Sequence, residues 1–260
     1  MKKWSVLFMG FCLSLLVVAG CSQGDAKSDN ALENIEESKV IRVGIEGAYP
    51  PFNYYNDKNE LEGFDVDIAN EIASRMGVEV EYVVTPWDSI IGGLLSDKYD
   101  VIISSMAITE ERKEKVDFTE PYYRTGAQLF ALEDSEMVDA NTDVNGKNIG
   151  VSTGTTFTEK VEELGGTAKL YKNDFLAFQD LANGRIDGVI TDKAVGSRLI
   201  LENDYPAKAI GDILYDEVAG ITLNKNQEDL LKEISKHIEE LDADGTYKEI
   251  SMKWFGENIR

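Results

Sequence analysis

The chain has 260 residues, of which 43% are hydrophobic, and a formal net charge of −22 at pH 7. That length suits two domains of about 100–130 residues, and the hydrophobic content supports packed cores rather than a disordered chain. The acidic excess argues against a nucleic-acid partner, because binding to phosphate backbones requires a surplus of Lys and Arg.

The first element in chain order is an export signal, predicted over residues 1–20. Lys2 and Lys3 precede an apolar stretch at 4–18, which is short for a membrane span. The stretch ends in Val-Ala-Gly-Cys, which resembles a bacterial lipobox and would expose Cys21 for lipid attachment after cleavage. Cys21 is the only cysteine outside the signal, so it has no intramolecular disulfide partner. A simple signal anchor is the alternative.

Residues 21–38 are polar and lack a periodic pattern, which predicts a flexible tether. Together with the signal, this segment predicts an exported protein that lipid on Cys21 holds at the outer face of the cell membrane. The folded part of the chain is then expected to begin at residue 39.

From residue 39 onward, strand-like segments alternate with helix-like segments. The first run predicts strands at 40–44, 78–84 and 101–104 and helices at 64–76 and 88–95. The second run predicts strands at 147–151, 170–171 and 188–191 and helices at 157–164, 173–181, 228–241 and 247–255. This alternation predicts an α/β fold with mainly parallel sheets flanked by helices.

Two twelve-residue segments align without gaps: LLSDKYDVIISS at 94–105 and LANGRIDGVITD at 181–192. Asp100 matches Asp187 in this alignment, and the pair of serines that ends the first segment matches the Thr-Asp pair that ends the second. The match indicates two similarly built lobes. Each would place polar side chains at the carboxyl end of a parallel strand, where ligands bind in open α/β sheets.

Several of these polar residues have the chemistry that an amino-acid zwitterion requires. Arg112 offers a guanidinium for the carboxylate, and the turn at 152–156 leads into a helix whose first N–H groups are unpaired. Asp192 offers an anion for the ammonium group, and Ser104 and Ser105 offer hydroxyls.

Each of these features also has a purely structural interpretation. Arg112 lies in a run of charges typical of a solvated helix, and Asp192 could be the cap of the helix that follows it. The turn at 152–156 could be an ordinary polar turn, and Phe52 and Trp87 could be core aromatics.

The sequence contains no motif for a metal, a cofactor or a nucleophilic active site. Its sole histidine, His237, falls on what is expected to be an acidic surface helix, with a structural or inert role. Without a His/Cys cluster, a Walker loop or a GxGxxG motif, we predict no metal, no cofactor and no catalytic residue.

Taken together, the motifs resemble the substrate-binding proteins of ABC importers for polar amino acids, bacterial extracellular solute-binding protein family 3, over about residues 40–256. The most specific segments are SSMAITEERKEKVDFTEPYY at 104–123 and DGTYKEISMKWFG at 244–256. They are accompanied by GIEGAYPPF at 44–52, LEGFDVDIANEIASRMG at 61–77, VSTGTTF at 151–157 and GRIDGVITD at 184–192.

The resemblance implies a two-lobed periplasmic-binding-protein-like fold whose lobes are joined by two hinge crossovers. Lobe 1 would contain residues 39–129 and 220–260, and lobe 2 residues 130–219. It also implies a membrane partner, the permease of an ABC importer. We expect a monomer that binds no nucleic acid.

The same resemblance implies roles around a polar amino acid held between the lobes. Arg112 and Thr156 would bind the α-carboxylate, and Asp192, Ser104 and Ser105 would bind the α-ammonium group. The complete predicted ligand-binding set is Glu46, Tyr49, Phe52, Trp87, Ser104, Ser105, Ala107, Arg112, Thr153, Thr155, Thr156, Phe157 and Asp192.

Glu46 gives the main indication of the ligand's side chain, which Tyr49 and Trp87 would enclose by the same resemblance. A carboxylate there could pair with arginine or lysine, accept bonds from the amide of glutamine, or bind the second ammonium group of cystine. Phe157 and Ala107 depart from the polar residues that the family often has at these positions, so the preference stays open.

Two other classes of function remain as alternatives. One is an exported enzyme on the same scaffold, similar to cyclohexadienyl dehydratase, with Glu46 as a general acid. The other is a module that presents its ligand to a separate sensor.

Overall fold

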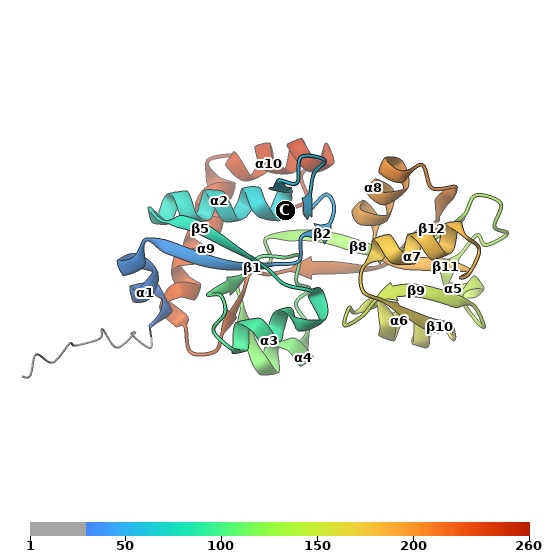
Figure 1. Ribbon diagram of the computed structural model, residues 1–260, viewed down its shortest axis with the longest axis horizontal. Helices are drawn as coiled ribbons and strands as arrows, with labels where there is room; N and C mark the ends of the chain where they lie inside the picture. The colour runs from blue at the N-terminus through green and yellow to red at the C-terminus, as the bar shows by residue number, and fades with distance from the viewer. Residues whose placement is uncertain (1–29) are drawn as a thin grey trace, which may run out of the picture.

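The computed structural model describes residues 30–260 of the chain (Figure 1). The predicted signal at 1–20, Cys21 and the first part of the predicted tether, residues 21–29, lie outside the described residues.

Two lobes lie side by side, each built around a five-stranded sheet (Figure 1). The sheet of lobe 1 has the order β5-β1-β6-β13-β7, from β1 (Val40–Ile45), β5 (Glu79–Val84), β6 (Val101–Ile102), β7 (Val116–Phe118) and β13 (Thr222–Asn224). The sheet of lobe 2 has the order β10-β9-β11-β8-β12, from β8 (Tyr123–Leu132), β9 (Asn148–Ser152), β10 (Thr167–Tyr171), β11 (Gly188–Asp192) and β12 (Ala207–Ala219). The predicted two-lobed α/β architecture is confirmed.

Helices cover both sheets. Lobe 1 carries α1 (Ala31–Ser38), α2 (Phe64–Met76), α3 (Ile90–Leu95), α4 (Glu110–Lys115), α9 (Glu228–Ala243) and α10 (Thr246–Phe255), with a 3₁₀ turn at Trp87–Ser89. Lobe 2 carries α5 (Ala140–Asp143), α6 (Phe157–Glu163), α7 (Asp174–Ala182) and α8 (Lys193–Asn203). A small three-stranded sheet of β2 (Ala48–Tyr49), β3 (Asn53–Tyr55) and β4 (Leu61–Glu62) follows β1.

Each sheet has a parallel half and an antiparallel half. β1 pairs in parallel with β5 and β6, and β9 does so with β10 and β11. The alternation of strands and helices in the sequence predicts these parallel pairings. The antiparallel pairings of β7 with β13 and of β8 with β11 and β12 arise because the chain passes between the lobes twice.

The two crossovers are β8 and β12, which pair with each other along the passage between the lobes (Figure 1). Their antiparallel pairing begins with Tyr123 opposite Ala219. Ala127 of β8 already pairs with Asp192 of β11, so the pairing of β8 with β11 begins three residues before residue 130, where lobe 2 is expected to begin.

The predicted flexible tether at 21–38 is wrong for its last eight residues, which form α1. The Asn30 side chain accepts the N–H of Leu32 and caps the helix, and the N–H of Ala31 donates to Gln227 Oε1 at 2.8 Å. Ile35 is buried in the core of lobe 1. So short a helix is marginal on its own, and its contact with α9 stabilises it.

His237 is buried rather than placed on the surface of α9, with only 3% of the residue exposed. Its ring nitrogens lie 2.9 Å from a Glu233 oxygen and 2.8 Å from a Glu240 oxygen. These contacts join neighbouring turns of one helix, which agrees with the predicted structural role.

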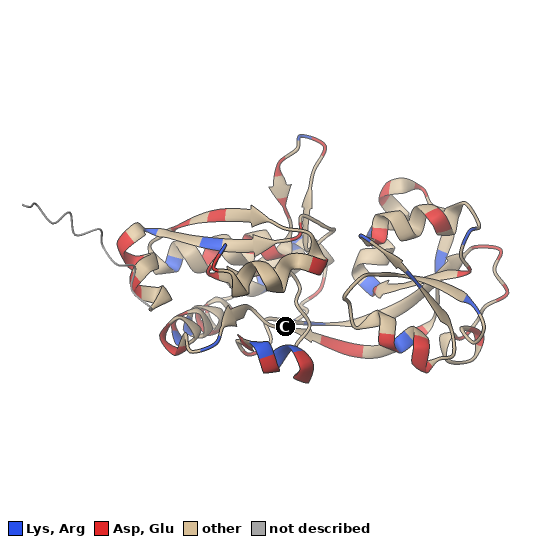
Figure 2. Cartoon of the chain, turned by 60° about the horizontal axis from the view of Figure 1, so that its bottom comes forward, with Lys and Arg blue, Asp and Glu red and all other residues tan. Residues whose placement is uncertain are grey.

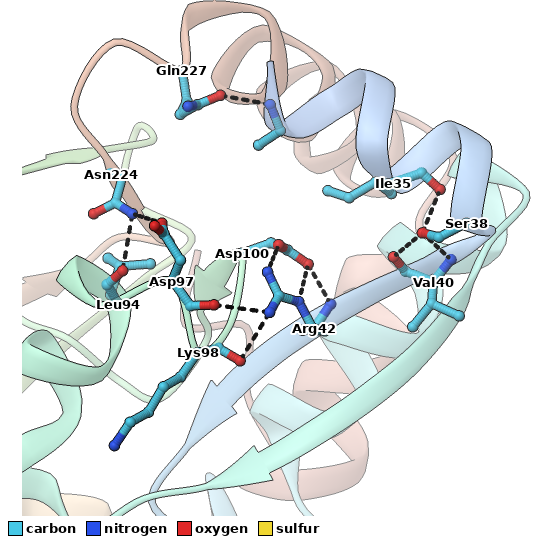
Figure 3. A network of polar contacts seen from close by, with 11 residues as sticks. Ile35, Ser38, Val40, Arg42, Leu94, Asp97, Lys98, Asp100, Asn224 and Gln227 are labelled. Carbon is cyan, nitrogen blue, oxygen red and sulfur yellow. Dashed lines mark hydrogen bonds and ion pairs between the residues drawn. The ribbon is translucent and has the colours of Figure 1, made fainter. Parts of the chain in front are cut away.

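The aligned aspartates make the same contact in both lobes. Asp100 accepts the N–H of Arg42 near the start of β1, and Asp187 accepts the N–H of Asn148 at the start of β9, each at 2.8 Å. In lobe 1 the Arg42 side chain adds an ion pair with Asp100 and donates to the carbonyl of Asp97 at 2.8 Å (Figure 3). The internal repeat therefore encodes the junction of two neighbouring parallel strands.

Candidate functional site

A pocket lies between the lobes, beside the crossover strands. Its walls are formed by Glu46, Tyr49, Trp87, Ser104, Ser105, Ala107 and Arg112 of lobe 1, by Ser152, Thr155, Thr156 and Phe157 of lobe 2, and by Glu217 of β12. All but three of the residues predicted to bind a ligand lie on these walls.

Strand ends explain why the chain gathers these side chains in one place. Glu46 directly follows β1, Ser104 follows β6, and Ser152 is the last residue of β9. The carboxyl ends of parallel strands open toward one edge of a sheet, and the two sheets turn these edges toward each other. Polar residues placed there become the walls of the cleft.

Arg112 lies on α4, whose N-cap residue Thr109 accepts the Arg112 N–H through its side chain. The guanidinium donates to the carbonyl of Ala107 at 2.8 Å and to the carbonyl of Gly154 in lobe 2 at 3.1 Å. It also lies 5.4 Å from the centre of the Trp87 ring. Arg112 therefore lies on the pocket wall, as predicted for a ligand-binding residue, and not in the solvated position of the alternative structural interpretation.

Burial lowers the pKa of the Arg112 guanidinium, which shows that the charge is incompletely compensated. No carboxylate of residues 30–260 lies within ion-pair distance of it. Only two of its five N–H donors are occupied by the carbonyls. An anion that entered the pocket would stabilise the charged guanidinium and so offset the unfavourable effect of its burial.

The lobes touch at the Gly154 carbonyl. This oxygen accepts from Arg112 and also from the indole N–H of Trp87 at 3.3 Å. Both donors belong to lobe 1, and Gly154 belongs to the turn before α6 in lobe 2. The two walls of the pocket are therefore in direct contact at this carbonyl.

Glu46 is half-buried on the wall of lobe 1, and its backbone N–H donates to Ser104 Oγ at 3.0 Å. Burial, followed by the charge of Asp174, raises the pKa of Glu46 to about 8. Alone in the pocket, the carboxyl group therefore holds a proton at neutral pH. A cationic group beside it would favour the ionised form.

Ser105 is held by a buried network behind the pocket wall. Its Oγ donates to Asp65 at 2.9 Å, and its N–H donates to the Tyr122 hydroxyl at 3.1 Å. Asp65 also accepts from Tyr122 at 2.7 Å and from Asn53 at 2.8 Å, while burial raises the pKa of Asp65 to about 6. The network fixes Ser105 in a left-handed conformation with φ of 56°.

Lobe 2 has a counterpart of this network at Asp174. The hydroxyls of Ser152 and Thr191 donate to Asp174 at 2.7 and 2.9 Å. Like Asp65, Asp174 lies in the first turn of a helix and is buried, and burial raises its pKa. Each lobe thus anchors its pocket-facing strand ends to one buried carboxylate.

Three predicted residues do not line the pocket. Phe52 is buried in an aromatic cluster, 4.8 Å from the ring of Tyr123, and Thr153 donates its hydroxyl to the carbonyl of Tyr171 at 3.0 Å. Asp192 caps α8 by accepting the N–H of Ala194 at 2.7 Å, and burial raises the pKa of Asp192 to about 7. For Phe52 and Asp192 the structural interpretations describe the observed contacts.

Two residues on the walls were absent from the prediction, Ser152 and Glu217. Ser152 was assigned only to a turn, although it ends a strand as Ser104 nearly does. Glu217 comes from a crossover strand without a local motif, and its neighbour Asp216 is exposed while Glu217 is half-buried. The alternation of side chains along a strand that borders a cleft is the signal that could have found it.

Within the part of the chain that the structure covers, no group of His, Cys, Asp and Glu residues has the arrangement of a metal site. In the same residues, no helix combines the length and apolarity needed to cross a bilayer.

The chain is similar to known proteins over most of its length. The family model of bacterial extracellular solute-binding proteins, family 3, matches residues 41–257. The L-cystine-binding protein TcyJ of Escherichia coli (strain K12) is 33% identical over 250 residues, which cover 95% of this chain and 94% of that protein.

Solved structures give the same likeness. An ancestral arginine-binding protein bound to glutamine superposes with a TM-score of 0.81 at 39% identity, covering 84% of this chain and 99% of that one. The ancestral amino acid-binding protein AncCDT-1, described as a precursor of cyclohexadienyl dehydratase, superposes with a TM-score of 0.80 at 30% identity, covering 87% and 99%.

Proposed function

Because this chain belongs to family 3 of the bacterial extracellular solute-binding proteins, we propose that it captures a polar amino acid between its lobes and delivers it to the permease of an ABC importer. The observation that carries the proposal is a pocket with walls from both lobes that holds a guanidinium without an ion-pair partner among the described residues. The pocket thus offers a cation for the carboxylate of a zwitterion, and Ser104 and Ser105 offer oxygen acceptors for its ammonium group.

The α-carboxylate of the ligand would bind the free donors of Arg112 and the hydroxyl of Thr156. Each charge-assisted bond of this kind contributes about 1.5–3 kcal/mol where water is excluded. The α-ammonium group would bind near Ser104 and Ser105, whose backbone carbonyls and hydroxyls follow β6. Asp192 would assist only after a change in its position, because it caps α8 and does not line the pocket.

The side chain of the ligand would lie between Tyr49 and Trp87 and reach toward Glu46. A cationic group fits there, since it would ionise a carboxyl group whose pKa burial raises to about 8. A protonated Glu46 can instead exchange hydrogen bonds with an amide. We therefore infer a basic or amide-bearing ligand, namely arginine, lysine or glutamine, or else cystine, whose second ammonium group would reach Glu46.

Thermal-shift measurements against the twenty amino acids, ornithine and cystine test the proposed function. Binding to the folded state raises the melting temperature according to ligand concentration and affinity. We expect a large shift with one or a few basic or amide-bearing amino acids, or with cystine. A response to aspartate or glutamate alone would contradict the proposed ligand class, and no response to any amino acid would contradict amino-acid binding.

A second candidate function is an enzyme of the cyclohexadienyl dehydratase type, in which Glu46 acts as general acid. It is favoured by the protonated state that burial gives Glu46 near pH 7 and by the likeness to AncCDT-1. Conversion of prephenate or arogenate, followed by product absorbance, separates the two functions. We expect no turnover, since the pocket already accounts for recognition of an amino acid.

The proposed place of action is the outer face of the cell membrane, with lipid on Cys21 and a monomeric folded part. Radiolabelled palmitate incorporation, compared between the native chain and Cys21→Ser, tests the anchor. Presentation of the ligand to a separate sensor would use the same closed form and is compatible with delivery to a permease.

A further inference from the structure

Glu217 is the one pocket residue that comes from a crossover strand. It is half-buried and lines the pocket together with Arg112 and Thr156. The Thr156 hydroxyl donates a hydrogen bond to the Glu217 carboxylate and accepts one from the hydroxyl of Tyr215 at 3.1 Å. Tyr215 and Glu217 are two residues apart on β12, so they face the same side of the strand.

The contacts of Glu217 overlap with those assigned to the ligand. The proposed partners of the α-carboxylate are Thr156 and Arg112. Glu217 already takes the hydroxyl of Thr156, and among the charges that act on Arg112 its carboxylate has the largest effect. It does not reach ion-pair distance to Arg112, so it fills the carboxylate position only in part.

We propose that Glu217 is an internal substitute for the ligand's carboxylate, which an incoming amino acid must displace from Thr156 before it can bind. The proposal rests on the amino-acid-binding function proposed above. It deepens that function by identifying a residue that limits the affinity for ligands with a free α-carboxylate.

The physical reason is competition between like charges for one set of donors. Two carboxylates a few ångströms apart repel each other, and this repulsion is strong in a pocket that excludes water. A ligand carboxylate that reaches Arg112 and Thr156 therefore has to move the Glu217 carboxylate away or lead it to take up a proton. Either step lowers the net affinity below what the contacts of the ligand alone would give.

The same competition makes the effect of Glu217 specific to the carboxylate of the ligand. A ligand with a free carboxylate recovers the cost of displacement through a direct ion pair with Arg112, which Glu217 does not make. A ligand whose carboxylate is blocked as an amide has no charge with which to replace Glu217 at the donors. Such a compound leaves Glu217 in place, so Glu217 lowers the affinity for the free amino acid and has little effect on the affinity for its carboxamide.

The test compares Glu217→Gln with the native protein by isothermal titration calorimetry. The probes are the amino acid that gives the largest thermal shift and its α-carboxamide. Glutamine keeps the shape and can accept from Thr156, but it carries no charge. We expect Glu217→Gln to bind the free amino acid about 10-fold more tightly, a change of about 1.4 kcal/mol, and to change binding of the carboxamide by less than about 2-fold.

Asp216→Asn is the matched control, because it removes the same charge from the adjacent, exposed residue of β12. It should leave both affinities unchanged. Glu217→Ala serves as a second variant if the glutamine variant does not fold, and a gain is expected there too. Unchanged or weaker binding of the free amino acid in the Glu217 variants overturns the proposal, as does an equal gain for both probes.

Failure of the inference differs from failure of the proposed function. If the native protein binds an amino acid and the variants show no selective gain, Glu217 is an ordinary wall residue and the function stands. If the native protein binds no amino acid, the proposed function fails and the role of Glu217 fails with it.

Discussion

Arg112 is the residue on which the proposed recognition depends most. Its guanidinium is fixed by two carbonyls and by the face of Trp87, so little side-chain freedom remains to be lost on binding. We expect Arg112→Ala to weaken ligand binding by at least about 100-fold, because two charge-assisted bonds contribute roughly 3 kcal/mol or more. Calorimetric titration measures the loss, and circular dichroism should show an unchanged fold.

Lys113→Ala is the control for this variant, since Lys113 is exposed and pairs with Glu110 on the same helix. Its affinity should match that of the native protein. Arg112→Ala that binds as tightly as the native protein would show that the guanidinium serves only to join the lobes.

Single residues also show where sequence-based prediction of the site ends. Arg112 and Glu46 could be placed because their positions in family-like motifs fix what surrounds them. Asp192 was predicted to bind the ligand and is observed to cap α8, and the sequence does not separate these roles, since both use the same carboxylate at the same strand end. Glu217 was missed, because it lies in no local motif and its contact with Thr156 joins residues 61 positions apart.

Among the elements, α1 shows how tertiary contacts decide the state of a short polar segment. Ile35 is 1% exposed against the lobe 1 core, whereas Glu36 is exposed. Removing a buried Ile side chain costs about 2–4 kcal/mol, because the apolar contacts are lost and a cavity is left. We therefore expect Ile35→Ala to lower the melting temperature by roughly 5–10 °C, with Glu36→Ala as the unaffected control in the same thermal scan.

If Ile35→Ala melted at the native temperature, α1 would contribute nothing to the stability of the fold. The segment would then behave energetically as the predicted flexible tether. The sequence could not predict this helix, since its polar residues lack a long apolar stripe. The repeated strand junction was predictable, because Asp100 and Asp187 bond to backbone atoms that a gapless alignment brings into register.

At the scale of the whole molecule, negative charge is spread over both lobes (Figure 2), and several carboxyl groups are buried as well. Burial raises the pKa of Asp65 to about 6, of Asp192 to about 7 and of Glu46 to about 8. Between pH 4 and 8 the folded protein therefore binds more protons than the unfolded chain, so stability decreases as the pH rises.

We expect the melting temperature of the ligand-free protein to fall by roughly 5 °C or more between pH 5.5 and pH 8, measured in buffers of equal ionic strength. The contribution of these groups is complete near pH 4 and is lost as the pH passes through about 6 to 8. Glu46→Gln should flatten the upper part of this profile. A melting temperature that rises steadily from pH 5.5 to pH 8 would contradict the assigned protonation states.

The overall architecture was predictable to the level of two α/β lobes, because strand and helix periodicities are local. The antiparallel half of the second sheet and the contact between the lobes were not, since β8 and β12 are continuous strands that belong to the passage as well as to that sheet.

The contact at Gly154 has a consequence for how such a protein can change over evolutionary time. The oxygen that receives Arg112 and Trp87 belongs to the main chain, so no side-chain replacement removes it. Neighbouring side chains such as Thr155 and Phe157 can therefore vary while the lobes keep their point of contact. Replacement of these pocket side chains is thereby separated from the contact that joins the lobes.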